Sequence, residues 1–284
     1  MAQLSLRFGR RRTRPLLHLI ACYFFLFAPA ARRNSLRYLS RALGRPARAA
    51  DWYRLLLTFG TTIHDRIFLL NDHWQEFSFD IEGEALLEHQ QSQGALLLGA
   101  HLGSFEAIRA VGRRRPALRI AMAMYPDNAR KMAAMLTAIA PDADIDLIAL
   151  GRADALLQIR DRFEAGALVG MLGDRSVAEE AGHAVDFLGA TAHLPLAPLR
   201  AAAALRRPVI FMLGLHAGDN RYEIVFEPLA DFSAVEAGQR DVAVRAALLR
   251  YTQLLEQYCR RYPYNWFNFH DFWRRPAGAG DARV

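Results

Sequence analysis

The chain has 284 residues, of which 52% are hydrophobic, enough to bury the core of one domain with a small appendage. Its two cysteines, Cys22 and Cys259, stand far apart and fit no metal-ligand spacing, which argues against a disulfide framework or a thiolate zinc site. The net charge of +7 is uneven, because residues 1–50 hold eleven arginines and no acid while the rest holds 25 basic and 29 acidic side chains. This pattern argues against a nucleic-acid-binding surface and predicts a local anionic partner near the N-terminus.

The N-terminal segment combines an apolar run with basic flanks. Seventeen residues without a formal charge separate Arg14 from Arg32. As a helix they would reach about 25 Å, short of the ~30 Å hydrocarbon core, and Pro29 shortens that helix further. Five arginines precede the run and six follow it, so the positive-inside rule chooses no orientation. We therefore expect residues 1–35 to form a basic, apolar membrane anchor.

How this anchor meets the bilayer stays open at the sequence level. A short signal-anchor span and a helix lying in the interface, with its flanks on anionic headgroups, both fit the pattern. A buried core helix is the third alternative. A cleaved signal peptide is disfavoured, because six arginines closely follow the apolar run.

Helical and strand-like patterns then follow one another along the chain. Residues 36–76 read as helical with a break at Gly44–Pro46, and residues 83–93, 127–139, 152–166 and 241–261 have helical spacing. The expected strands are residues 77–82 (FSFDIE), 94–100 (GALLLGA), 118–124 (LRIAMAM), 144–150 (DIDLIAL), 167–174 (ALVGMLGD), 207–216 (RPVIFMLGLH) and 221–228 (RYEIVFEP).

This alternation predicts an α/β fold with a mixed, largely parallel sheet flanked by helices, in one domain of residues 36–284 that follows the N-terminal membrane-anchoring helix. Functional sites of such folds gather at the carboxyl ends of the strands. His101 and Asp174 each lie at the end of an expected buried strand. We therefore expect these two polar clusters at the same edge of the sheet.

The first of these clusters is "GAHLGSFE", in which Glu106 stands five positions after His101. If a helix begins near Gly103 or Ser104, Glu106 lies in its first turn and can reach back to the imidazole. A histidine oriented by a carboxylate keeps one tautomer and can accept a proton from a hydroxyl. Gly103 would let a substrate approach the backbone, and nearby helix amides could stabilise an oxyanion. The structural alternative is that Glu106 only caps the helix.

Other catalytic templates fit less well. The sequence has no G-x-S-x-G nucleophile elbow, no H-E-x-x-H zinc motif, no Walker A loop and no G-x-G-x-x-G fingerprint. Its nine histidines lack ligand spacing. We therefore expect neither a metal nor a cofactor.

Three features together resemble a known family: "GAHLGSFE", "GALVGMLGDRS" followed by "AVDFLGATAHLPLAPLRAAAALRRPVI", and the aromatic "RYPYNWFNFHDFW". The chain is similar to the bacterial lipid A biosynthesis acyltransferases, within the lysophospholipid acyltransferase superfamily, over nearly its whole length. The C-terminal aromatic segment resembles the branch found beside glycolipid and aryl-polyene lipid biosynthesis genes. The histidine and glutamate of "GAHLGSFE" are by themselves a weakly specific motif, whereas the three features together are a specific signature of the family.

The resemblance implies transfer of an acyl chain from a thioester, usually on an acyl carrier protein, to a hydroxyl of a lipid or glycolipid at the bacterial inner membrane, with the catalytic domain on the cytoplasmic side. It implies that His101 is the general base and Glu106 its orienting acid. The remaining residues that it places at the substrate are Gly103, Ser104, Asp174, Arg175, Phe187, Gly189 and Thr191.

Two alternatives stay open at this point. The same His–Glu pair could act on water, as in a thioesterase. Alternatively, the pair could be structural in a membrane-docked lipid-binding protein. The sequence specifies neither the length of the acyl chain nor the acceptor, and an acyl-CoA donor is compatible with it as well as an acyl carrier protein.

Overall fold

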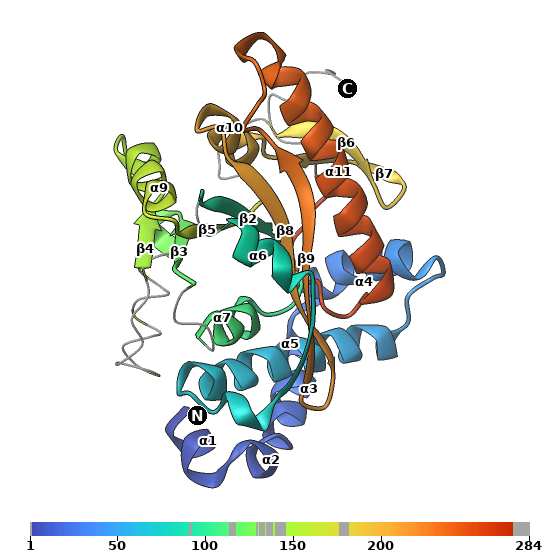
Figure 1. The fold of residues 1–284 in the computed structure, drawn as a ribbon. Helices are drawn as coiled ribbons and strands as arrows, with labels where there is room; N and C mark the ends of the chain where they lie inside the picture. The colour runs from blue at the N-terminus through green and yellow to red at the C-terminus, as the bar shows by residue number, and fades with distance from the viewer. Residues whose placement is uncertain are drawn as a thin grey trace.

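The computed structural model describes residues 2–90, 93–113, 118–128, 130, 134, 139, 146–175 and 182–274 (Figure 1). The expected helix over residues 127–139 lies largely outside the described residues. The other expected strands and helices are confirmed with shifts of a few residues at their ends.

Five helices open the chain: α1 (Ala2–Phe8), α2 (Arg10–Thr13), α3 (Leu16–Phe27), α4 (Pro29–Leu43) and α5 (Ala49–Leu70). As expected from its fixed backbone, Pro29 interrupts the apolar helix, so α3 ends at Phe27 and α4 starts at the proline. Among the described helices, none is by itself long and apolar enough to cross a bilayer. The α2–α3 stretch and α4 meet that test only together, across a bend of 97°.

The described strands form a seven-stranded sheet in the order β1-β9-β8-β2-β5-β3-β4. Five run parallel: β2 (Ala95–Gly99), β3 (Ile120–Met124), β4 (Asp146–Ala149), β5 (Leu168–Leu172) and β8 (Pro208–Gly218). The hairpin partner β9 (Arg221–Asp231) and the edge strand β1 (Ser78–Glu82) run the other way. The expected mixed, largely parallel sheet is therefore confirmed.

Helices cover both faces of this sheet (Figure 1). Leu96 and Leu98 of β2 point to the face covered by α9 (Ala155–Glu164), α10 (Ala197–Ala204) and α11 (Arg240–Arg261). Ala95 and Leu97 alternate to the other face, under α6 (Glu84–Gln90) and α7 (Phe105–Arg113). Because β2 is buried on both faces, its sequence is a continuous apolar run rather than an alternating one.

A separate two-stranded hairpin, β6 (His183–Phe187) and β7 (Ala190–Leu194), packs near α11. Leu188 and Gly189 form its two-residue turn, and both have positive φ angles, of 51° and 75°. Such a turn matches the right-handed twist of the flanking strands. This hairpin is not among the strands expected from the sequence.

Candidate active site

His101 and Asp174 meet at the carboxyl edge of the sheet, because their strands β2 and β5 are parallel neighbours. The Nδ1 atom of His101 lies 2.8 Å from Asp174 Oδ1, and the backbone N–H of His101 donates to Oδ2 at 3.1 Å. The expectation that the two clusters share one edge is confirmed. The pair joins residues 73 positions apart.

Asp174 is 1% exposed, and the indole N–H of Trp266 also donates to its Oδ2, at 3.1 Å. Burial alone would raise the pKa of this carboxyl, but the neighbouring imidazole, Arg175 and the indole outweigh it and lower the pKa to about 2. An ionised carboxylate only accepts hydrogen bonds, so in the neutral imidazole of His101 the proton lies on Nδ1 and the lone pair on Nε2. The His101 side chain is 32% exposed, so a substrate can reach the imidazole.

Glu106 was expected to orient the imidazole of His101, but its carboxylate binds other residues. Its Oε1 lies 2.9 Å from Nε of Arg66 on α5, and its Oε2 accepts the hydroxyl of Ser104 at 3.3 Å. Within the described part of the chain, Asp174 is the carboxylate bonded to the imidazole. The reason is local: α7 begins at Phe105, and its first turn directs the buried Glu106 toward α5.

Gly103 and Ser104 have structural partners of their own. A Cβ on Gly103 would lie 2.1 Å from the carbonyl oxygen of Gly214, so the glycine lets strand β8 approach rather than a substrate. The Gly103 amide donates to the carbonyl of Asn265 at 2.9 Å, and the Ser104 amide donates to Gly214 at 2.6 Å. The Ser104 hydroxyl caps α7 by accepting the Ala107 amide at 3.2 Å. The backbone amides of Gly103 and Ser104 are therefore both bonded within the protein.

Arg175 lies directly beside the His101–Asp174 pair. One guanidinium nitrogen donates to the carbonyl of Phe267 at 3.2 Å, whereas the buried Nε has no hydrogen-bond partner among the described residues. Burial lowers the pKa of Arg175, and Asp174 opposes that shift. The site therefore holds a partly desolvated cation with an unused donor.

The C-terminal aromatic segment packs around the same site. Trp266 is fully buried, and the ring of Phe187, also fully buried, lies against it with centroids 5.4 Å apart. Phe272 packs on Trp266 at 4.7 Å. Phe187 thus supports the tryptophan that bonds Asp174, while Gly189 supplies only the open turn of the hairpin.

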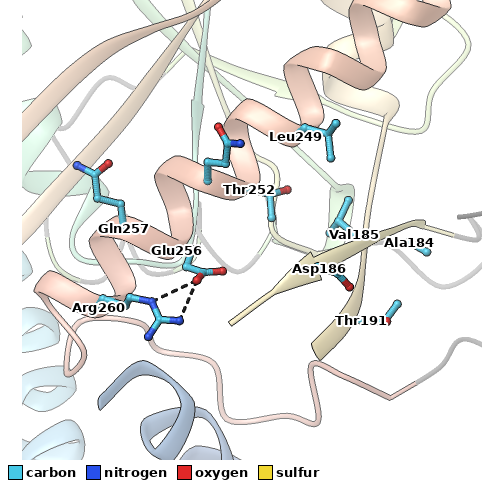
Figure 2. Close-up of a pocket in the computed structure, with 10 residues that line it drawn as sticks. Ala184, Val185, Asp186, Thr191, Leu249, Thr252, Glu256, Gln257 and Arg260 are labelled. Carbon is cyan, nitrogen blue, oxygen red and sulfur yellow. Dashed lines mark hydrogen bonds and ion pairs between the residues drawn. The ribbon is translucent and has the colours of Figure 1, made fainter. Parts of the chain in front are cut away.

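Thr191 lies elsewhere. It lines a polar cleft between the β6–β7 hairpin and α11, together with Asp186, Thr252, Glu256 and Arg260 (Figure 2). Neither His101 nor Asp174 lines that cleft. The structure therefore brings together His101, Asp174 and Arg175 from the sequence-based set, with Phe187 behind them, and sets Thr191 apart.

Three contributors were not singled out from the sequence: Trp266, Asn265 and Arg66. The first two lie in the "RYPYNWFNFHDFW" segment, whose indole and amide groups can form hydrogen bonds and could therefore have been predicted to contact the site. Arg66 gave none, because it is one arginine within a helical stretch, 40 positions before its partner Glu106. Among the described residues, no three His, Cys, Asp or Glu side chains gather closely enough to hold a metal ion.

Comparison with known proteins assigns the chain to a family. No individually curated protein matches the chain. The sequence profile of one family, described as bacterial lipid A biosynthesis acyltransferase, matches residues 4–275, which include the whole described site. The chain belongs to the bacterial lipid A biosynthesis acyltransferase family.

Proposed function

We propose that this acyltransferase moves a fatty acyl chain from a thioester, carried by an acyl carrier protein, to a hydroxyl of a lipid or glycolipid at the cytoplasmic face of the bacterial inner membrane. His101 is the general base. The observation that carries the proposal is the 2.8 Å contact between His101 Nδ1 and the buried, ionised Asp174.

The chemistry follows from that contact. Asp174 keeps the proton on Nδ1, so Nε2 of His101 accepts the proton of the acceptor hydroxyl. The hydroxyl oxygen then attacks the thioester carbon, the C–S bond breaks, and the imidazolium returns its proton to the leaving thiolate. This direct route needs no acyl-enzyme intermediate. Burial raises the pKa of the Cys259 thiol, which disfavours the thiolate that a covalent route through this residue would need.

Arg175 and Glu106 have supporting roles in this proposal. The guanidinium of Arg175, next to Asp174, stabilises the oxyanion that forms on the thioester carbonyl. Glu106 acts as a positioning residue, because its ion pair with Arg66 fixes the first turn of α7, directly after His101, against α5.

An apolar cavity of about 610 Å³ supports a lipid substrate. It opens between α3 and α5, and its lining is almost entirely hydrocarbon, including Phe24, Phe59, Ile63 and Phe269. Arg66, the partner of Glu106, lines the same cavity. Its size lies within the range of small-molecule sites. We assign it to an alkyl chain of a substrate, with the Arg66–Glu106 pair at its polar wall.

Membrane docking through residues 1–35 forms part of the proposal. Helix α3 exposes large apolar side chains at Leu19, Tyr23, Leu26 and Phe27, each between 59% and 69% accessible. An apolar patch of this kind, next to clustered arginines, suits the interfacial zone of an anionic bilayer. We favour an in-plane arrangement because the apolar helix stops at Phe27.

Transfer can be measured with purified full-length protein, labelled acyl carrier protein thioester and candidate lipid acceptors. We expect labelled product only when an acceptor hydroxyl is present. Free fatty acid formed regardless of acceptor would identify a thioesterase, and binding without turnover would identify a lipid-binding protein. Replacing the carrier thioester by acyl-CoA tests the donor separately.

Docking is tested by Leu19→Gln/Leu26→Gln on the exposed face of α3. Because these side chains are 69% exposed, the variant should keep its thermal unfolding midpoint while losing flotation with anionic vesicles. Burying each leucine is worth roughly 1.5–3 kcal/mol, so the loss should be at least about tenfold. Leu156→Gln/Leu157→Gln on α9 serves as the matched control, because both residues are exposed but lie outside the proposed anchor. Unchanged flotation of the α3 variant would contradict in-plane docking.

A further inference from the structure

A second, chemically different cleft lies on the other side of the α3–α5 contact. It has a volume of about 680 Å³ and is formed by the α2–α3 junction, α5, the β8–β9 turn and the segment after α11. Its charged and basic lining side chains are Arg11, Arg14, Arg54, Arg261, His18, His216 and Asp219. The cleft gathers arginines from three separate parts of the chain.

Two of the four arginines in this cleft have no carboxylate partner among the residues that the structure describes. Asp219 is the single carboxylate in the lining, is 90% exposed, and lies 3.5 Å from Arg14. Arg261 pairs with Glu223, which lies outside the lining. Arg11 and Arg54 have no ion pair among the residues that the structure describes. The cleft therefore carries an excess of at least two guanidiniums.

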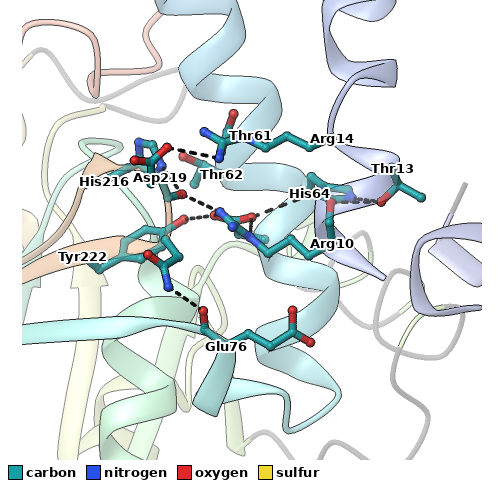
Figure 3. Close-up of polar contacts among 12 residues, drawn as sticks. Arg10, Thr13, Arg14, Thr61, Thr62, His64, Glu76, His216, Asp219 and Tyr222 are labelled. Atoms are coloured by element: carbon teal, nitrogen blue, oxygen red, sulfur yellow. Dashed lines mark hydrogen bonds and ion pairs between the residues drawn. The ribbon is translucent and has the colours of Figure 1, made fainter. Parts of the chain in front are cut away.

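The structure holds these cations in place. The guanidinium of Arg54 stacks over the ring of Tyr264 at 4.5 Å, which orients it at the cleft wall. Arg14, Thr61, His216 and Asp219 gather beside the buried Arg10 (Figure 3). Arg10 itself is locked by Asp65, with Nε–Oδ1 at 2.7 Å, so the adjoining Arg11 and Arg14 start from a fixed backbone. Oriented guanidinium groups favour phosphate oxygens, which they can bind in pairs.

The position of the cleft indicates where the phosphate comes from. Pro15 and His18, at the start of α3, line it, and the exposed apolar residues of α3 begin immediately afterwards at Leu19. A group held here lies at the boundary between a basic and an apolar surface, which is where lipid headgroup phosphates lie at a bilayer. We propose that this cleft, lined by Arg11, Arg14, Arg54 and Arg261, binds the phosphate of a membrane lipid headgroup.

This inference rests on the membrane docking proposed above, and it is tested on vesicles with the full chain. Vesicles of an uncharged galactolipid receive either phosphatidic acid or oleate, adjusted to equal surface potential. The wild-type protein should prefer the phosphatidic acid vesicles. In Arg11→Gln/Arg54→Gln, each lost guanidinium should lower affinity for these vesicles roughly fivefold, and the preference over oleate should disappear.

Arg32→Gln/Arg33→Gln on α4 is the matched control, because it removes the same charge from exposed arginines outside the cleft. It should weaken binding to both kinds of vesicle by one common factor. Equal wild-type affinity for the two kinds of vesicle would overturn the phosphate site, as would loss of the preference in the control variant. Failure to bind either kind would overturn docking and the phosphate site together, whereas acyl transfer assayed in detergent micelles would still report on the chemistry.

Discussion

At the scale of single residues, the site depends on a buried carboxylate that stays ionised. Asp174 accepts hydrogen bonds from the His101 backbone, the His101 ring and the Trp266 indole. These contacts turn an otherwise unfavourable buried charge into one that fixes the imidazole. Acid titration of Asp174 should therefore weaken both the fold and the base.

Because its pKa is lowered in the folded protein, Asp174 makes the protein less stable as the pH falls. A carboxyl at about 2 in the folded protein and near 4 when unfolded contributes stability above pH 4, and that contribution is lost as the pH falls toward 2. Its size is about 2 kcal/mol. Urea unfolding between pH 5 and about 2.5 should show a smaller pH dependence for Asp174→Asn than for wild type. Parallel curves for the two proteins would exclude Asp174 as the responsible group.

At the scale of elements, helix α5 is tied to the C-terminal segment through Asp51. Its Oδ2 accepts the Arg48 amide at 2.7 Å and caps the helix. The carboxylate also accepts Arg45 at 2.9 Å and the Tyr264 hydroxyl at 2.8 Å. Hydrogen bonds from Arg45, then those from Arg48 and Tyr264, hold the pKa of Asp51 well below its usual range despite burial. Since Tyr264 directly precedes Asn265 and Trp266, this contact anchors the wall of the site.

We expect Asp51→Ala to lower the free energy of unfolding by about 2 kcal/mol, because it removes a helix cap and the carboxylate that accepts hydrogen bonds from Arg45 and Tyr264. Tyr264→Phe, which removes one hydrogen bond, should cost about 1 kcal/mol. Denaturant unfolding at neutral pH measures both. Equal costs for the two variants would show that the cap contributes nothing beyond the Tyr264 contact.

The sequence anticipated the site only where adjacent elements determine it. The apolar run before His101 and the one before Asp174 identify two buried parallel strands, and parallel strands bring their carboxyl ends to one edge. The pairing of β2 with β5 depends on strand order, which the two segments do not encode locally. For that reason the nearby Glu106 was a more natural partner for His101 than the distant Asp174.

Helix starts and turns explain the other differences. Ser104 caps α7, and in the first turn of that helix the Glu106 side chain points toward Arg66 on α5 rather than back to the imidazole. The β6–β7 turn uses Leu188 at φ 51°, a residue type that is rare in the left-handed region, so the hairpin lacked the usual Asn-Gly or Asp-Gly signal.

At the scale of the whole molecule, the N-terminal helices are built into the body. Arg10 on α2 is 5% exposed and pairs with the fully buried Asp65 on α5, which also accepts the Tyr222 hydroxyl from β9 at 2.9 Å (Figure 3). Thr13 contacts His64 at 2.9 Å in the same network. These contacts connect the segment proposed to dock on the membrane directly to the sheet.

We therefore expect Arg10→Ala to destabilise the protein by about 3–5 kcal/mol, since it leaves the Asp65 carboxylate buried without its cation. The double replacement Arg10→Met/Asp65→Leu should cost less than Arg10→Ala, because no unpaired charge remains. Thermal unfolding of both variants measures the difference. A double variant less stable than Arg10→Ala would contradict this account. Because Arg10 lies within residues 1–35, deletion of this segment should destabilise the body as well as remove the docking helix.

The central claim is that Asp174 orients His101 for proton abstraction. Its most direct test is the single-turnover rate of acyl transfer at saturating donor for His101→Ala, Asp174→Asn and Glu106→Gln, each checked for wild-type circular dichroism. Loss of the base should abolish transfer, and Asp174→Asn should reduce the rate about 10²- to 10⁴-fold by releasing the required tautomer. Glu106→Gln should lose less than Asp174→Asn. A fully active Asp174→Asn beside an inactive Glu106→Gln would contradict the account and return the orienting role to Glu106.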